Sequence, residues 1–190
     1  MANYPYIIAS FPDMVLDFKQ RPVDEKAVVD EIKGQLSEKD GKLVDWLEFG
    51  LEGTHLKPHF YRNIRQTGCR FLIDWFDFDK KLRLAKVAFL ENKPYAEDFP
   101  ELEKAEIIFK VDNLAQREKL LDRLCWDKAA ELVQFDIFTI DTILSLLVRL
   151  HIAARWSRLD PKAGAALFKR FVDEVKGTFQ GINAEQIQSR

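Results

Sequence analysis

The sequence predicts an all-α protein, a multi-helix bundle, and three observations support this fold class. The segment 139–157, TIDTILSLLVRLHIAARWS, is the longest apolar stretch, and its apolar residues recur every three or four positions. The same spacing recurs in several other segments of the 190-residue chain. The alternation typical of a strand is confined to residues 4–11, for which no partner strand is evident. We therefore expect one helical domain over residues 1–178, organised around the helix 139–157.

The segment 139–157 has the features of a buried central helix. Thr139 is placed to cap its first turn, and Asp141 lies where the helix dipole favours a carboxylate. The apolar stripe extends almost all the way round, which predicts packing on several sides. The charges at Asp141 and Arg149 leave only seven uncharged residues between them, far short of the roughly 20 needed to cross a bilayer. The segment is therefore predicted to be a core helix and not a membrane span.

Composition and charge indicate a folded protein that does not bind nucleic acid. Apolar residues make up 47% and charged residues 32% of the chain, as in soluble folded proteins. A net charge of −2 lacks the surplus of lysine and arginine that phosphate binding requires. Cys69 and Cys125 are widely separated, which suggests free thiols in a reducing compartment. Residues 1–13 lack the pattern of a secretory signal, so we expect a cytoplasmic protein.

The N-terminal part is predicted to contain one extended segment and two helices. Aromatic and β-branched residues lie between Pro5 and Pro12, so residues 1–13 are expected to be extended. A helix is expected to begin near Asp24 and end before Ser37, and a second to cover residues 40–49.

The middle of the chain is predicted to form two helices in residues 57–93. The first covers residues 57–75, faces Arg62, Arg65 and Arg70 outward, and is weakened by Gly68. The second is expected to be capped by Asp77 or Asp79 and to end before Pro94. An ion pair between Asp79 and Arg83 is expected within it.

The remaining sequence predicts an internal linker and further helices. Residues 94–111 are expected to be a linker with a short helix at 102–109, followed by helices at 113–124 and 126–135. A final helix is expected to open at Pro161 and to continue to residue 175. Residues 179–190 are expected to be a frayed polar tail. The final helix is predicted to turn its apolar residues inward: Leu167, Phe168, Phe171 and Val172.

Two groups of residues are candidates for a metal or catalytic site. His55 and His59 have the spacing of zinc-binding histidines on a helix, but Pro58 separates them and no glutamate follows the first. Asp74, Asp77 and Asp79 could bind a divalent cation, although aspartate is also favoured simply as a cap and turn former. No phosphate-binding glycine loop or nucleophile motif is present. We therefore expect no catalytic residue, metal or cofactor, and keep a metal-dependent hydrolase built on these aspartates and one histidine as the alternative.

Three segments of the chain resemble a known family. They are YPYIIASFPDM at residues 4–14, FDFDKKLRLAKVAFL at 76–90 and WDKAAELVQFDIFTIDTILSLLVRLHIAARWSRLDPKAGAALF at 126–168. These segments are similar to a bacterial family of unassigned activity encoded with V/A-type ATPases. That family in turn resembles a reduced form of the C-type (or d-type) component of V-type ATPases.

The resemblance implies a non-catalytic structural or assembly subunit of a proton- or sodium-translocating ATPase. Such a subunit would join the central stalk to the membrane rotor ring, and would be peripheral on the inner face of the membrane. Stiff packed helices and a broad contact face would allow such a subunit to join the stalk to the rotor ring without a reactive centre. The expected partners are other V/A-type ATPase subunits, and a generic helical interaction scaffold is a further alternative.

Aromatic residues and arginines are the candidates for protein contacts. Aromatic residues make up 12% of the chain, and large aromatic side chains dominate both cores and interfaces. The predicted contact residues are Tyr4, Tyr6 and Phe11 in the N-terminal segment, and Arg62 and Arg65 on the first middle helix.

Overall fold

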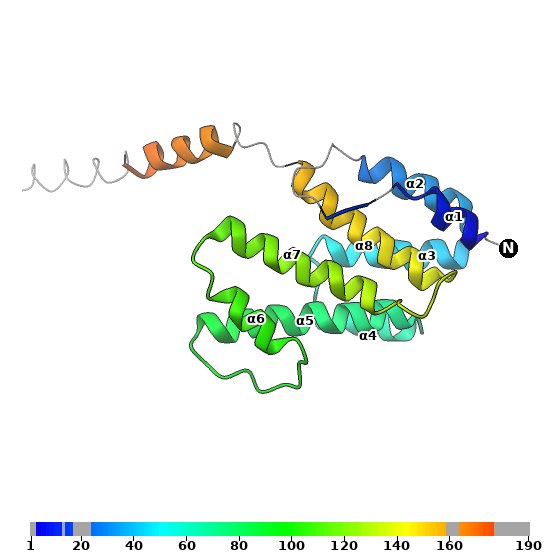
Figure 1. Ribbon diagram of the computed structural model, residues 1–190, viewed down its shortest axis with the longest axis horizontal. Helices are drawn as coiled ribbons and strands as arrows, with labels where there is room; N and C mark the ends of the chain where they lie inside the picture. Colours follow the sequence, from blue (N-terminus) through cyan, green and yellow to red (C-terminus); the bar gives the residue numbers. More distant parts are fainter. Residues whose placement is uncertain (1–2, 13, 17–23, 159–163, 177–190) are drawn as a thin grey trace, which may run out of the picture.

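The computed structural model describes residues 3–12, 14–16, 24–158 and 164–176, and within these residues the protein is all-α (Figure 1). A helical stretch at residues 164–176 follows the eight labelled helices. The labelled helices are α1 Tyr4–Ser10, α2 Glu25–Gln35, α3 Glu38–Leu51, α4 Pro58–Gln66, α5 Arg70–Leu90, α6 Leu102–Phe109, α7 Leu114–Glu131 and α8 Ile140–Ser157.

Helix α8 is the centre of the bundle, as predicted. It contacts α1, α2, α3, α5 and α7 (Figure 1). Its N-terminus is capped by Thr139, whose hydroxyl accepts a hydrogen bond from the backbone N–H of Thr142 at 3.4 Å. The buried Ser145 hydroxyl donates to the carbonyl of Ala129 at 2.6 Å, so the one polar side chain buried in this helix is satisfied by α7. The other buried side chains of α8 are Ile143, Leu144, Leu147, Val148, Leu150, Ile152, Ala153 and Ala154.

Helix α5 organises the other half of the bundle, where it contacts α3, α4, α6 and α8. Aromatic rings fill the space between these helices, and Phe60 and Phe76 meet edge to face with their centroids 4.9 Å apart. Gly50 of α3 lies directly against these two rings. A Cβ atom at Gly50 would lie 2.2 Å from the Phe76 ring, so this close contact between α3 and α5 requires glycine.

The prediction that residues 1–13 are extended is wrong for the described part of that segment. Residues 4–10 form helix α1, with the Asn3 side chain accepting a hydrogen bond from Tyr6 N–H and Pro5 in the first turn. Ile7 is buried, and α1 packs against α8. Tertiary packing therefore outweighs the extended preference of the β-branched and aromatic residues.

The boundary between the two middle helices lies at Gly68 and not at Asp77 or Asp79. Gly68 has a φ of +65°, a left-handed conformation that ends α4, and α5 then runs unbroken from Arg70 to Leu90. The expected cap residues are interior to α5, where Asp77 pairs with Lys81 at 2.9 Å. The predicted end before Pro94 is confirmed.

The two helices predicted at 113–124 and 126–135 are one helix, α7. Its buried residues Leu121, Trp126 and Ala129 follow one another at helical spacing, so the apolar face continues across the expected break. The Asn113 side chain caps the start by accepting from Gln116 N–H at 2.9 Å. The expected break at residue 125 does not exist.

The short helix predicted within residues 94–111 is confirmed as α6. The segment before it is tied to the bundle, because Phe99 is buried and Glu101 forms an ion pair with Lys128 of α7 at 2.6 Å. Both charged side chains of this pair are mostly buried. Residues 94–101 are therefore anchored to the bundle at Phe99 and Glu101, although they contain no helix.

The final helix is confirmed over residues 164–176, but its apolar face is not buried. Leu167, Phe168 and Phe171 are exposed, with Phe168 71% exposed, and Val172 is half-buried. Figure 1 shows this helix beyond the end of α8 and away from the bundle. The predicted start at Pro161 and the predicted frayed tail at 179–190 lie outside the described residues.

Candidate interaction surface

A groove with a volume of about 590 Å³ lies between α4, α5 and the segment that precedes α4. We call it the cationic groove, because its charged lining residues are all positive: Arg62, Arg65, Lys80 and Arg83. The remaining lining residues are Gly53, Leu56, Pro58, Tyr61 and Leu84.

The turn at Gly68 brings the two pairs of cations together. Arg62 and Arg65 are three residues apart on α4, and Lys80 and Arg83 are three residues apart on α5, so each pair shares one helix face. The left-handed conformation of Gly68 ends α4, and α4 then packs against α5. Helix packing thus places both cationic pairs along the same groove.

Most of the positive charge in the cationic groove is not neutralised by the described residues. Arg62 and Arg65 are exposed, as predicted, and neither forms an ion pair with a residue in the described ranges. The Lys80 ammonium lies 5.8 Å from the centre of the Tyr61 ring. Of the four cations, Arg83 alone has a carboxylate partner among the described residues, Asp79 at 2.8 Å. The groove is therefore suited to an anionic group.

The predicted aspartate cluster is divided among separate cations. Asp74 lies 3.6 Å from Arg70, and Asp77 and Asp79 pair with Lys81 and Arg83. Burial raises the pKa of Asp79, and the charge of Arg83 only partly opposes this rise. Each aspartate therefore serves an ion pair within its own helix.

The two histidines do not join these aspartates. The His55 ring stacks on Phe49 with centroids 4.2 Å apart, and its Nε2 lies 3.2 Å from Glu52. His59 lines a different pocket, beside Trp46. In the part of the chain that the structure describes, no three His, Cys, Asp or Glu side chains are grouped so that they could hold a metal ion. The described residues thus give the hydrolase alternative no ligand set.

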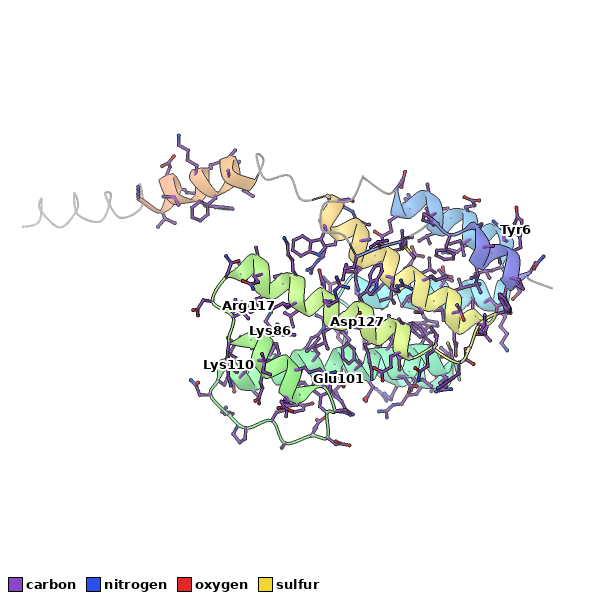
Figure 2. The ribbon with its side chains drawn as sticks, viewed as in Figure 1. Tyr6, Lys86, Glu101, Lys110, Arg117 and Asp127 are labelled. Carbon is purple, nitrogen blue, oxygen red and sulfur yellow. The ribbon has the colours of Figure 1, made fainter. Side chains whose placement is uncertain are left out.

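The three predicted N-terminal contact residues differ in their exposure. Tyr4 donates a hydrogen bond from its hydroxyl to Asp40 at 2.9 Å, and burial, with the adjacent carboxylate, raises its pKa. Phe11 packs against the core. Tyr6 is 63% exposed and lies at the outer edge of α1 (Figure 2). Tyr6 is therefore the most accessible of the three aromatic residues.

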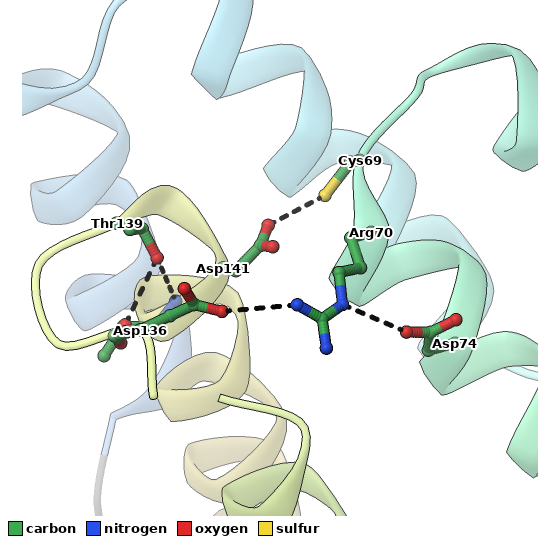
Figure 3. Close-up of polar contacts among 7 residues, drawn as sticks. Cys69, Arg70, Asp74, Asp136, Thr139 and Asp141 are labelled. Atoms are coloured by element: carbon green, nitrogen blue, oxygen red, sulfur yellow. Dashed lines mark hydrogen bonds and ion pairs between the residues drawn. The ribbon is translucent and has the colours of Figure 1, made fainter. Parts of the chain in front are cut away.

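Polar contacts join the start of α5 to the first turn of α8 and to the loop before it (Figure 3). The Cys69 thiol lies 3.2 Å from Asp141, and Arg70 lies between Asp74 and Asp136. Burial raises the pKa of Cys69 to about 12, and the Asp141 carboxylate adds to this rise. The thiol is therefore protonated at neutral pH, and the neighbouring Arg70 does not activate it.

A smaller cavity of about 180 Å³, lined by both polar and apolar side chains, lies among α3, α5, α7 and α8. Asp122, which lines it, accepts hydrogen bonds from Arg155 at 2.7 Å and from the Trp156 indole. Burial raises the Asp122 pKa despite these partners. Burial also raises the pKa of Cys125, and His151 is bound to Glu25 at 2.7 Å. The ionisable groups of this cavity thus have partners or are held neutral.

Sequence reasoning identifies one side of the cationic groove and misses the other. The local pattern places Lys80 and Arg83 in the second middle helix, but nothing in it shows which helix lies opposite them. A usable signal is the repetition of two cations three residues apart on both sides of Gly68, a residue suited to a reversal of direction.

Residues 91–178 match the family model described as a protein of unknown function, DUF2764. This match covers α6, α7, α8 and the helix 164–176, and it includes none of the helices α1 to α5. No curated protein and no solved structure matches the chain. The match therefore concerns the C-terminal half and assigns no activity.

None of the helices in the described ranges has both the length and the apolar content to span a bilayer.

Proposed function

We propose that the protein is a non-catalytic structural or assembly subunit of a V/A-type proton- or sodium-translocating ATPase. In this proposal it acts as an adaptor between the central stalk and the membrane rotor, in the cytoplasm and peripheral to the membrane. The observation that carries the proposal is the resemblance of residues 4–14, 76–90 and 126–168 to the family encoded with these ATPases. The proposal requires protein contacts and no catalytic group.

Three features of the structure support the proposal. The helices pack around α8, which contacts helices from both halves of the bundle, and this arrangement suits a body that must transmit force without deforming. Arg62 and Arg65 are exposed and lack a described carboxylate partner, so they are available to an external partner. Tyr6 offers an exposed aromatic side chain on a different part of the bundle.

The test is co-purification from cells that contain the native ATPase. A tagged full-length chain is expected to enrich identified stalk or rotor subunits, and Arg62→Glu with Arg65→Glu is expected to reduce that enrichment. The matched control is Lys104→Glu with Arg123→Glu, which makes the same charge change at two exposed cations on α6 and α7. Failure to enrich any stalk or rotor protein would reject the proposal, and enrichment of an unrelated complex would favour the generic scaffold.

Deletion of residues 2–12 is a poor test of the N-terminal contact, because it would also remove the buried Ile7 and the Tyr4 hydrogen bond to Asp40. Tyr6→Ser is a better test, since the side chain is exposed. We expect Tyr6→Ser to weaken co-purification while the melting temperature stays unchanged. Unchanged co-purification would remove Tyr6 from the contact surface.

A further inference from the structure

We infer that the cationic groove binds an acidic segment of a partner protein. In the bound state, aspartate or glutamate side chains of that segment pair with Arg62, Arg65 and Lys80, while its apolar side chains contact Leu56 and Leu84. This inference deepens the proposed function by naming the chemistry of the partner, and it rests on that function only in treating the groove as a protein-binding surface.

Charge complementarity is the first argument. The groove contains four cations and no carboxylate among its lining residues, and only Arg83 has an ion-pair partner in the described part of the chain. Two other aspartates of α5, Asp74 and Asp77, are paired with Arg70 and Lys81, which do not line the groove. An acidic segment would therefore meet three cations of the groove that have no ion-pair partner among the described residues, Arg62, Arg65 and Lys80.

The apolar part of the lining is the second argument, and it favours a polypeptide over a small anion. Leu56, Pro58 and Leu84 line the same groove as the four cations, and Leu84 is 39% exposed. A partner that carries both carboxylate and apolar side chains can contact both kinds of surface, as interface segments commonly do. A free phosphate would leave the leucines exposed to water.

The backbone at the groove is the third argument, because three backbone positions at or beside it have no free N–H group to offer a phosphate. Phosphate sites commonly use free backbone N–H groups at a helix N-terminus. Here Pro58 occupies the first turn of α4 and has no N–H, and the Phe60 N–H already donates to the Lys57 carbonyl at 2.9 Å. The Gly53 N–H donates to the Gly50 carbonyl at 3.1 Å. Recognition therefore depends on side chains.

The binding experiment uses a fluorescein-labelled peptide of glutamate and leucine, with a second peptide in which glutamine replaces every glutamate. Fluorescence anisotropy is measured with the full-length protein at low and at high salt. We expect the acidic peptide to bind, the glutamine peptide to bind at least about tenfold more weakly, and high salt to weaken binding, because exposed ion pairs are screened.

Variants locate the binding site. Arg62→Glu with Arg65→Glu is expected to weaken acidic-peptide binding at least about tenfold, because the two introduced carboxylates repel the carboxylates of the peptide. Lys104→Glu with Arg123→Glu, with the same net charge, is expected to bind as the unaltered protein does. If circular dichroism shows that the first variant is unfolded, Arg62→Gln with Arg65→Gln replaces it, and the same direction of change is expected.

Three results would overturn the inference. The acidic peptide could fail to bind, or the two charge-reversed variants could lose binding equally, which would indicate a general charge effect. Inorganic pyrophosphate could bind more tightly than the peptide with the same dependence on Arg62 and Arg65, which would indicate a phosphate site. This test can fail independently of the ATPase proposal. Peptide binding without enrichment of any ATPase subunit would support the groove inference alone. Enrichment of ATPase subunits without peptide binding would support the ATPase proposal alone.

Discussion

Two regions of the molecule have the same helical pattern and opposite surroundings. In the bundle, Phe60 of α4 is fully buried, whereas Phe168 of the helix 164–176 is 71% exposed. Both helices place apolar residues on one face. The comparison teaches that the spacing of apolar residues predicts which face of a helix is apolar, but not whether that face meets a partner within the same chain.

The largest effect is expected from a cavity in the bundle. Phe60→Ala removes a ring that contacts Phe76 at a centroid distance of 4.9 Å, and should lower the free energy of unfolding by about 3–5 kcal/mol. Urea denaturation followed by circular dichroism measures the change. A loss near that of an exposed phenylalanine would mean that α4 is not part of the cooperative core.

A smaller loss of stability is expected at Gly50, where close packing leaves no space for a side chain. Gly50→Ala places a methyl group 2.2 Å from the Phe76 ring, and should lower the free energy of unfolding by about 1–3 kcal/mol although alanine favours a helix. The control is Gly34→Ala in α2, where a Cβ meets nothing within 4 Å and should be neutral or stabilising. Equal effects of the two substitutions would contradict the close contact of α3 with α5.

A loss of stability at acidic pH is expected at the edge of the bundle, where Glu25 binds His151 and Arg158. Burial raises the pKa of Glu25, but the hydrogen bond and charge of His151 and the charge of Arg158 outweigh burial and lower the pKa overall. A lowered folded-state pKa stabilises the protein at pH values above the unfolded-state pKa of about 4.3, and that stability is lost as pH falls through the folded-state pKa.

Glu25→Gln should therefore lower the free energy of unfolding by about 1–2 kcal/mol at pH 7. The difference between this variant and the unaltered protein should shrink as pH falls below about 4. Thermal melts between neutral and acidic pH measure it, and Glu31→Gln at an exposed position of the same helix is the control. If the difference in stability between Glu25→Gln and the unaltered protein were constant over the whole pH range, the lowered pKa of Glu25 would not contribute to stability.

The smallest effect on stability is expected in the helix 164–176. Phe168→Ala with Phe171→Ala should change the free energy of unfolding by less than about 0.5 kcal/mol, because both rings are exposed. The measurement is the same urea titration as for Phe60→Ala. A loss of several kcal/mol would show that this apolar face packs on the bundle in solution, and the contrast between the two regions would then disappear.

Local signals explain the parts of the fold that can be predicted from the sequence. The cap at Thr139 and the uninterrupted apolar spacing specify α8, and residues 102–109 are bounded by turn-forming sequence and specify α6. Wrong boundaries arise where a residue suits two roles. Asp77 and Asp79 resemble helix caps, but inside α5 each is neutralised by a cation four residues later.

Long-range packing explains what the sequence does not predict. Residues 4–10 have β-branched and aromatic side chains, and their helix depends on burial of Ile7 against other helices. The outward orientation of Arg62 and Arg65 follows from local spacing. Their position opposite Lys80 and Arg83 depends on how α4 packs after Gly68, which no local pattern contains.

The central position of α8 also determines which parts of the protein unfold locally and which unfold only with the whole bundle. Since α8 contacts α1, α2, α3, α5 and α7, its amide protons should exchange with deuterium only when the whole bundle unfolds. Outer helices can open by smaller fluctuations and exchange sooner. The slowest exchange rates in the protein should therefore cluster between Ile143 and Ala154, and should report directly on global stability.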